Sequence, residues 1–230
     1  MSIHDAHRQR MREQIRQKGL DGFTEIQVLE LLLFYTIPRA DTNETAHRLL
    51  DRFGSLVNVL QASERELREV EGVGEQSAFF LSLLPQVLRF YQIRESGNMK
   101  RARSTDEYIS YMIPYFAELH DETVYLLCLD AKGKILGCEK IGVGTVNSAN
   151  APLRRIMEAA IRLNASMAVL AHNHPSGLAV PSKEDVQVTE FVASMLKSID
   201  VVLADHIIVA SGDAVSLYES RYYDPHAFLA

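Results

Sequence analysis

The hydrophobic periodicity of this chain changes once, between residues 92 and 105, and that change restricts the folds open to it. Before residue 92 the apolar residues recur at helical spacing, as Leu29, Leu33 and Phe34 do. After residue 105 short apolar runs typical of strands alternate with segments of helical periodicity. We therefore predict an α/β protein: an all-helical N-terminal domain followed by an α/β domain with a central mixed sheet.

A polar stretch between the two patterns predicts a domain boundary. Residues 94–104 read RESGNMKRARS, with one glycine, a basic cluster and no hydrophobic periodicity. Such a composition is typical of a linker. The predicted domains are therefore residues 1–93 and 105–230, joined by residues 94–104.

Local signals place the elements of the second domain. Ser104 can cap a helix over residues 105–117, and a second helix is expected over residues 183–197. The apolar run 167–171 predicts a strand that is covered on both faces. Two strands before it form a hairpin in which we expect Cys128 to face Ile135. In that register the two cysteines are out of line, which disfavours a disulfide.

Composition and charge limit the cellular setting and the partners. No apolar run approaches 18 residues, and the N-terminus MSIHDAHRQRMREQ is polar rather than a signal sequence. We therefore expect a cytoplasmic protein that does not associate with membranes. The net charge of −6 argues against a broad electrostatic contact with nucleic acid.

The stretch AHNHPSGLAVPSKED, residues 171–185, contains the residue types of a metal site. His172 and His174 follow the apolar strand and are two residues apart, so their side chains point to the same side. The turn-forming loop after them allows Asp185 to come back towards both imidazoles. Two imidazoles, a carboxylate and a water would give a catalytic Zn²⁺ site with one exchangeable position, one ion per chain.

The same residues have a second interpretation. Ser182 and Asp185 match a capping box, which a helix that starts here requires with or without a metal. An isolated H-x-H pair is also a weak indication of a metal. The metal hypothesis depends on finding both features within one short stretch.

These residues resemble a known family. His172-x-His174-Pro175, followed by Ser182-x-x-Asp185, is similar to the JAMM signature of MPN-type zinc metallopeptidases, which include deubiquitinating isopeptidases. The segment HNHPSG, together with the later segment ADHIIV, resembles the sequences of the RadC proteins of bacteria. The resemblance also covers the helical half, in VLELLLFYTIPRADTNETAHRLLDRFGSLVNVLQAS and ELREVEGVGEQSA.

The resemblance implies a role for each residue of the site. His172, His174 and Asp185 would hold Zn²⁺, and Ser182 would hydrogen-bond the metal-activated water or the oxyanion. An upstream glutamate would act as general base and then as acid towards the leaving amine. Glu122 is the best match, with Glu118 and Glu139 as alternatives.

The pair Asp205-His206 interrupts an otherwise apolar strand, so at least one of the two side chains is expected to be buried and hydrogen-bonded. We favour a structural or supporting hydrogen bond over direct contact with the metal.

The helical domain contains a possible nucleic-acid-binding motif. Gly72-Val73-Gly74 resembles the hairpin of a helix-hairpin-helix, whose backbone N–H groups meet a phosphate. Residues 1–98 contain 12 basic and 14 acidic side chains, which opposes phosphate binding. The tight turn also has a purely structural interpretation, as a connection between two packed helices.

Two functions of different class follow from these observations. The leading hypothesis is a zinc-dependent hydrolase that cleaves a peptide or isopeptide bond of a protein or peptide substrate. The alternative is a DNA-associated repair or recombination accessory protein, in accordance with the DNA-repair name of the RadC proteins. A nuclease is disfavoured, because many nucleases use two metal ions.

Overall fold

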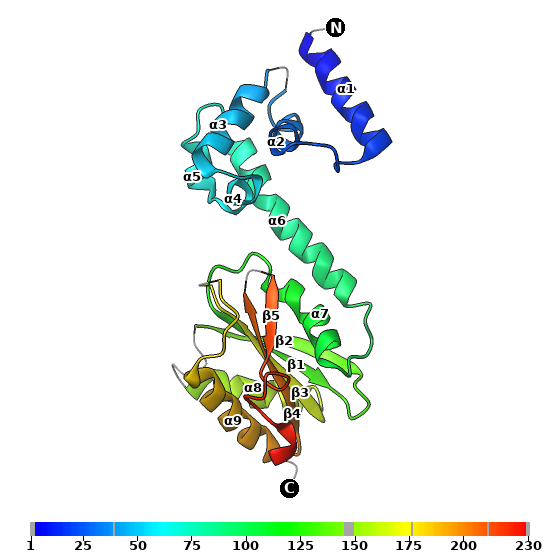
Figure 1. The fold of residues 1–230 in the computed structure, drawn as a ribbon, viewed down its shortest axis with the longest axis vertical. Helices are drawn as coiled ribbons and strands as arrows, with labels where there is room; N and C mark the ends of the chain where they lie inside the picture. The colour runs from blue at the N-terminus through cyan, green and yellow to red at the C-terminus, as the bar shows by residue number, and fades with distance from the viewer. Residues whose placement is uncertain (1–2, 39, 145–149, 176, 211, 229–230) are drawn as a thin grey trace. The chain divides into compact units, whose positions relative to one another are not determined.

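The computed structural model describes residues 3–38, 40–144, 150–175, 177–210 and 212–228. The chain forms two compact units, Met1–Leu88 (unit 1) and Arg89–Ala230 (unit 2) (Figure 1). None of the helices in the described residues combines the length and apolar composition that a membrane-spanning segment requires.

Unit 1 is built from short helices, and capping residues determine where several of them begin. Thr24 and Ser63 each form a capping box with the residue three positions later, and Gly54 ends a helix in a left-handed conformation. Leu29, Leu49 and Leu81 are fully buried between the helices. The helices are α1 (Ile3–Lys18), α2 (Glu25–Leu33), α3 (Asn43–Phe53), α4 (Leu56–Gln61), α5 (Glu64–Arg68) and the first part of α6 (Glu75–Ser96).

The predicted linker differs from the structure. Helix α6 continues to Ser96, so the boundary between the units falls inside a helix. Ala102 is fully buried in unit 2 and its N–H donates to Gly133 O, while Ile135 N–H donates to Lys100 O. These backbone contacts make residues 100–102 part of unit 2. Their polar sequence resembles a linker and gives no sign of these contacts.

Unit 2 is an α/β fold around one five-stranded mixed sheet of order β2-β1-β3-β4-β5. Among the described strands the pair β3–β4 alone is parallel, and helix α9 makes the crossover between these two strands. The elements are α7 (Thr105–Phe116), β1 (Thr123–Leu129), β2 (Ile135–Val143), α8 (Asn150–Arg162), β3 (Met167–Asn173), α9 (Lys183–Lys197), β4 (Val202–Ala210), β5 (Asp213–Ser216) and the 3-10 helix η2 (Pro225–Phe228).

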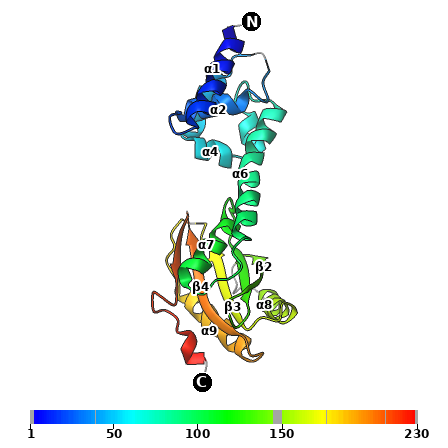
Figure 2. The ribbon, with the colours of Figure 1, turned by 90° about the vertical axis from the view of Figure 1, so that its right-hand side faces the viewer.

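Helices cover both faces of this sheet. Helix α7 packs on one face, and α8 and α9 pack on the other (Figure 2). Every residue of β1 is buried, and almost all of β3, as expected for strands covered on both sides. The predicted α/β class with a central mixed sheet is therefore confirmed.

The two cysteines lie on opposite faces of the sheet. Cys128 belongs to the core under α8 and α9, and Cys138 packs against the core under α7. The hairpin register differs from the predicted one: Cys128 pairs with Gly137 rather than Ile135, because Ile135 pairs with Leu129 and an irregularity separates Leu129 from Cys128. Both thiols are free, and the sheet itself separates them.

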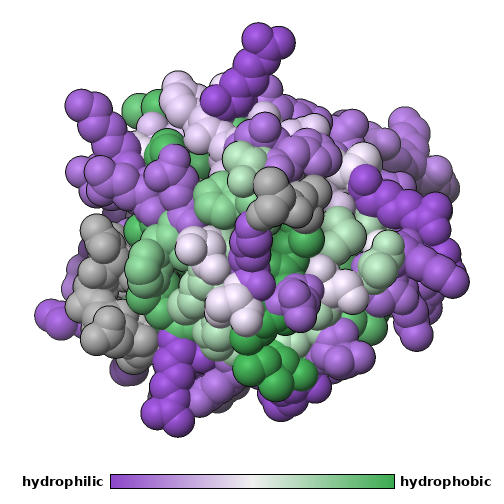
Figure 3. Space-filling view, turned by 90° about the horizontal axis from the view of Figure 1, so that it is seen from below, coloured by the Kyte–Doolittle hydropathy of each residue, from purple (hydrophilic) through white to green (hydrophobic). Residues whose placement is uncertain are grey.

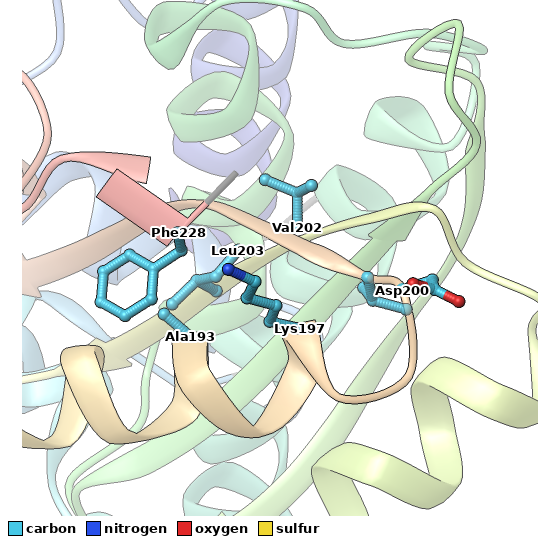
Figure 4. A pocket seen from close by; sticks show the side chains of 7 residues that line it. Ala193, Lys197, Asp200, Val202, Leu203 and Phe228 are labelled. Carbon is cyan, nitrogen blue, oxygen red and sulfur yellow. The ribbon is translucent and has the colours of Figure 1, made fainter. Parts of the chain in front are cut away.

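Figure 3 shows one face of the structure, with apolar side chains gathered near its centre and hydrophilic ones around them. A pocket of about 200 Å³ lies between α9, the start of β4 and η2, and is lined by Lys197, Asp200, Val202 and Phe228, among others (Figure 4). The pocket lies at the end of the sheet where β4 begins, whereas the residues of the predicted metal site lie near the opposite end.

Candidate metal centre

The structure brings together the three side chains that the sequence indicates as metal ligands. His172 and His174 stand at the end of β3, and Asp185 is in the first turn of α9. The two Nε2 atoms are 2.9 Å apart. His172 Nε2 is 3.1 Å from Asp185 Oδ1, and His174 Nε2 is 3.6 Å from Asp185 Oδ2.

The spacing and the chemistry of these atoms fit a tetrahedral metal ion. Ligand atoms at 2.0–2.1 Å from a tetrahedral zinc lie about 3.3 Å from one another. The separations of 2.9 Å between the two Nε2 atoms and 3.1 Å between His172 Nε2 and Asp185 Oδ1 are close to that value, and the second oxygen of Asp185 lies 3.6 Å from His174 Nε2. One possible ligand atom from each side chain lies within 4.8 Å of the others, and nitrogen with carboxylate oxygen is a usual donor set for zinc.

A backbone contact sets the tautomer of His174. Its Nδ1 lies 3.1 Å from Leu178 O, in the loop that connects the proposed ligands. Because a carbonyl oxygen only accepts, Nδ1 carries the proton. The lone pair of Nε2 then faces His172 and Asp185, as a metal ligand requires.

Asp185 serves the helix cap and the candidate metal site together. Its Oδ2 accepts hydrogen bonds from Ser182 N at 2.8 Å and Ser182 Oγ at 2.6 Å, and its own N–H donates to Ser182 Oγ. The other oxygen, Oδ1, is directed to His172. Burial acts to raise the pKa of Asp185, but the hydrogen bonds from His172 and Ser182 outweigh it and hold that pKa well below its usual range.

The capping box also determines where Ser182 points. Its hydroxyl donates to Asp185 Oδ2 and accepts from Asp185 N–H. The hydroxyl would have to turn away from Asp185 to donate to a substrate. The role of Ser182 in catalysis stays a prediction.

Behind His172, on the same face of the sheet, lies a second buried histidine. His206 Nε2 is 2.9 Å from His172 Nδ1, and His206 Nδ1 is 2.6 Å from Thr189 Oγ1. Burial, together with the nearby His172, lowers the pKa of His206 far below its usual value, so this imidazole is neutral.

Asp205 and His206 are adjacent in β4 and therefore face opposite sides of the sheet, and a bulge before them determines which side each one faces. Ala168 of β3 pairs with Leu203, and Val169 with Asp205, so one extra residue stands between them in β4. His206 then faces α9, while Asp205 accepts from Thr105 Oγ1 of α7.

Asp205 is a structural residue on the α7 face. Its carboxylate also accepts from Ser216 Oγ and from the backbone N–H groups of His206 and Tyr218. Burial raises the pKa of Asp205 despite these bonds. Both members of the pair are thus buried and hydrogen-bonded, as expected.

Glu122, the predicted general base, directly precedes β1. Val124 pairs with His172 in the sheet, so Glu122 reaches the same end of the sheet as the proposed ligands. The segment is held by Asn173, whose Oδ1 accepts from Thr123 N at 2.7 Å and whose Nδ2 donates to Asp121 O at 3.2 Å. Glu122 is half-buried and is not among the clustered ligand atoms.

The alternative glutamates are placed differently. Glu139 pairs with Leu126 in the middle of β1 and forms an ion pair with Arg162. Glu139 therefore lies away from the end of the sheet at which His172 stands. Glu118 lies in the turn before β1, with a positive φ of 59°.

The glycine hairpin of unit 1 has a packing role. Gly72 has a φ of +92°, and a Cβ added there would lie 2.5 Å from Thr45 Oγ1 of α3. Val73 is buried, and Arg48 donates to Glu71 O and pairs with Glu44. The contacts of Gly72, Val73 and Gly74 thus support the structural interpretation, and DNA contact stays a prediction.

Thr189 and Asn173 support the site but were not predicted from the sequence. Thr189 is fully buried and stands one helical turn after Asp185, within the apolar side of α9. A threonine among the apolar positions of this helix is a signal that the sequence offers. Asn173 lies between the two histidines, and the alternation of a strand predicts that it faces the other way.

Comparison with known proteins identifies the family of this chain. The model of the RadC-like JAB domain matches residues 102–222, more than half of the chain. The UPF0758 protein FN0909 of Fusobacterium nucleatum is 35% identical, over 94% of this chain and 96% of its own length. The matched segment contains β1 to β5 and all the residues of the candidate metal centre. The chain therefore belongs to the RadC family.

Proposed function

We propose that this protein is a zinc-dependent hydrolase that cleaves an amide bond in a protein or peptide. The observation that carries the proposal is the convergence of His172 Nε2, His174 Nε2 and an Asp185 oxygen at the end of β3. Unit 2 belongs to a JAB-domain family, which agrees with a hydrolase. A bound zinc would activate water and polarise the scissile carbonyl.

The residues of the chain would then move the proton. Glu122, at the same end of the sheet, would accept a proton from the attacking water and return it to the leaving nitrogen. Asn173 holds the backbone on the C-terminal side of Glu122 through Thr123 N–H, which limits the movement of the base.

The surroundings of the site favour a peptide over a nucleic acid. The loop 175–181 contains no charged residue, and its side chains Leu178 and Val180 are 68% and 62% exposed. Apolar side chains beside the site suit contact with a peptide, whereas phosphate binding relies on Lys and Arg.

A paired measurement tests this function. Zinc content would be determined in the parent protein and in Asp185→Ala, and hydrolysis would be screened on a proteome-derived peptide library. We expect about one zinc per chain in the parent and none in the variant. Equal zinc in both proteins would refute the metal site.

Two glutamate variants test the base. Glu122→Gln should keep its zinc and lose about 10²- to 10⁴-fold in the hydrolysis rate. Glu139→Gln is the matched control and should keep its rate, because Glu139 pairs with Arg162 away from the site. Equal losses in the two variants would remove Glu122 from the mechanism.

A further inference from the structure

Helix α6 carries apolar side chains on two opposite faces. One face is buried and contains Ser77, Ala78, Leu81 and Pro85. The other face stays exposed: its side chains Phe79, Val87, Phe90 and Tyr91 are 51%, 53%, 62% and 59% exposed. A helix that is apolar all round is normally buried on all sides, and a large exposed apolar patch marks an interaction site. The exposed face of α6 therefore indicates a binding partner.

The residues of this face follow the spacing of a coiled-coil seam. Phe80, Leu83, Val87 and Phe90 follow one another at steps of three, four and three residues. A repeat of 3.5 residues keeps such a row directed at a second helix, here over about three helical turns. The spacing therefore favours an α-helix as the partner of this face.

The exposed area matches that of a modest interface between two proteins. Full burial of an aromatic side chain covers about 150–250 Å², so Phe79, Phe90 and Tyr91 each leave roughly 100 Å² open. With the smaller shares of Leu83 and Val87, the face amounts to on the order of 500 Å². Two such faces would bury about 1,000 Å², which is the lower limit for a specific interface. Aromatic side chains are also enriched in such interfaces.

The charges at the two ends of the face select one direction of pairing. Arg94 occupies the seam position after Phe90, and its guanidinium lies 5.1 Å from the centroid of the Phe90 ring. In a parallel pair of identical helices the two Arg94 side chains would meet, and like charges oppose this arrangement. In an antiparallel pair Arg94 comes to the opposite end of the face, where Glu75 and Gln76 are exposed.

The antiparallel arrangement also matches the apolar side chains. When the two helices cross near Pro85, Phe80 of one copy meets Phe90 of the other, and Leu83 meets Val87. Every contact then occurs twice, as a two-fold axis requires. The face is thus complementary to itself, which identifies the partner helix as a second α6.

We propose that α6 is a dimerisation helix whose exposed face pairs in antiparallel direction with the same face of a second copy of this chain. The inference goes beyond the proposed function and does not depend on the metal site. Zinc content and molecular mass are measured separately, so each idea can fail while the other stands.

Sedimentation equilibrium of the full chain tests the dimer. The mean mass of the parent should rise from that of one chain towards twice that value as the concentration is raised. Val87→Glu and Phe90→Glu place a charge in the seam and should weaken association at least about tenfold. Val57→Glu is the matched control, because it makes the same exchange at a 58% exposed position of α4 and should associate as the parent does.

Two results would overturn the dimer. The first is a parent that keeps the mass of one chain at every soluble concentration, or a Val87→Glu variant that associates as tightly as the parent. The second concerns folding: both seam variants should keep the far-ultraviolet circular dichroism of the parent, because the exchanged side chains are exposed in the single chain. Loss of helix in Val87→Glu would show that this face is covered within one chain.

Disulfide cross-linking tests the direction of the pair. Leu83→Cys mixed with ¹⁵N-labelled Val87→Cys should give linked dimers that contain one labelled and one unlabelled chain, as mass spectrometry would show. Neither variant should cross-link efficiently to itself. The parent is the control for the native thiols of Cys128 and Cys138. A majority of dimers between identical chains would indicate parallel helices and contradict the proposed arrangement.

Discussion

The direction of one side chain relative to the sheet decides what that residue can do in unit 2. Cys128 and Cys138 stand on neighbouring strands but face different cores. Asp205 and His206 are adjacent in sequence, yet one supports α7 and the other faces α9. The extra residue in β4 sets this division, so deleting it would exchange the two faces.

Cys128 provides a prediction at this scale. Burial raises the pKa of Cys128 to about 12, and Glu139 adds to the effect. An ordinary thiol has a pKa near 8.5, so at pH 8 the folded protein should hold roughly a thousandfold less thiolate at this position. Iodoacetamide labelling followed by mass spectrometry should find Cys128 unreactive until denaturant is added.

The same shift predicts how stability depends on pH. A thiol whose pKa is raised in the folded state contributes full stability below its ordinary pKa. That contribution is lost as the pH rises from about 9 towards 12. The free energy of unfolding should fall over this range, and less so in Cys128→Ala. Rapid labelling of the folded protein at pH 8 would contradict the account.

The connection between α5 and α6 shows how two helices meet closely in unit 1. Gly72 lets the backbone pass against Thr45 of α3, in a conformation that L-residues disfavour. Gly74 has no positive φ, and a Cβ there would meet nothing within 4 Å. The two glycines of one motif therefore differ in their structural requirement.

Alanine substitutions test that difference. Gly72→Ala should lower the free energy of unfolding by about 1–3 kcal/mol, because it combines a strained φ with a clash against Thr45. Gly74→Ala should stay within about 0.5 kcal/mol of the parent. Denaturant titrations measure both. Adding Thr45→Ala to Gly72→Ala should remove the clash and leave the backbone strain. Equal losses of unfolding free energy in Gly72→Ala and Gly74→Ala would exclude the packing role of Gly72.

At the scale of the whole molecule, the two units can be observed separately. The chain has no tryptophan, and all its tyrosines except Tyr35 belong to unit 2. Several of them pack together, as Tyr115 does with Tyr111 and Tyr125. Tyrosine near-ultraviolet circular dichroism therefore reports mainly on the unit that contains the candidate metal centre.

This signal allows a test by metal removal. Zinc at about 100 times its Kd should stabilise unit 2 by about 2.7 kcal/mol. That corresponds to a rise of roughly 5–10 °C in the melting temperature followed by tyrosine circular dichroism. Chelator should reverse the rise. In Asp185→Ala zinc should have no effect, and an equal rise in that variant would place the binding elsewhere.

Much of the fold and of the site could be predicted, because the signals are local. The helix 183–197 follows from periodicity and a cap, and the meeting of His172, His174 and Asp185 follows from a strand, a loop and that helix. The contact of Thr189 with His206 and the bulge in β4 could not be predicted, since both depend on partners distant in sequence. The unit boundary was missed because α6 crosses it without a break.

The sequence separation of these contacts also bears on the order of folding. All three proposed ligands lie within residues 172–185, whereas the bond between His172 and His206 spans 34 positions and that between Thr105 and Asp205 spans 100. Each doubling of a loop adds about 0.6 kcal/mol of closure entropy. The ligand segment therefore closes with the smallest entropic cost. A zinc ion present during refolding would meet its ligands before the parallel strands β3 and β4 pair, and would change the folding rate as well as the stability.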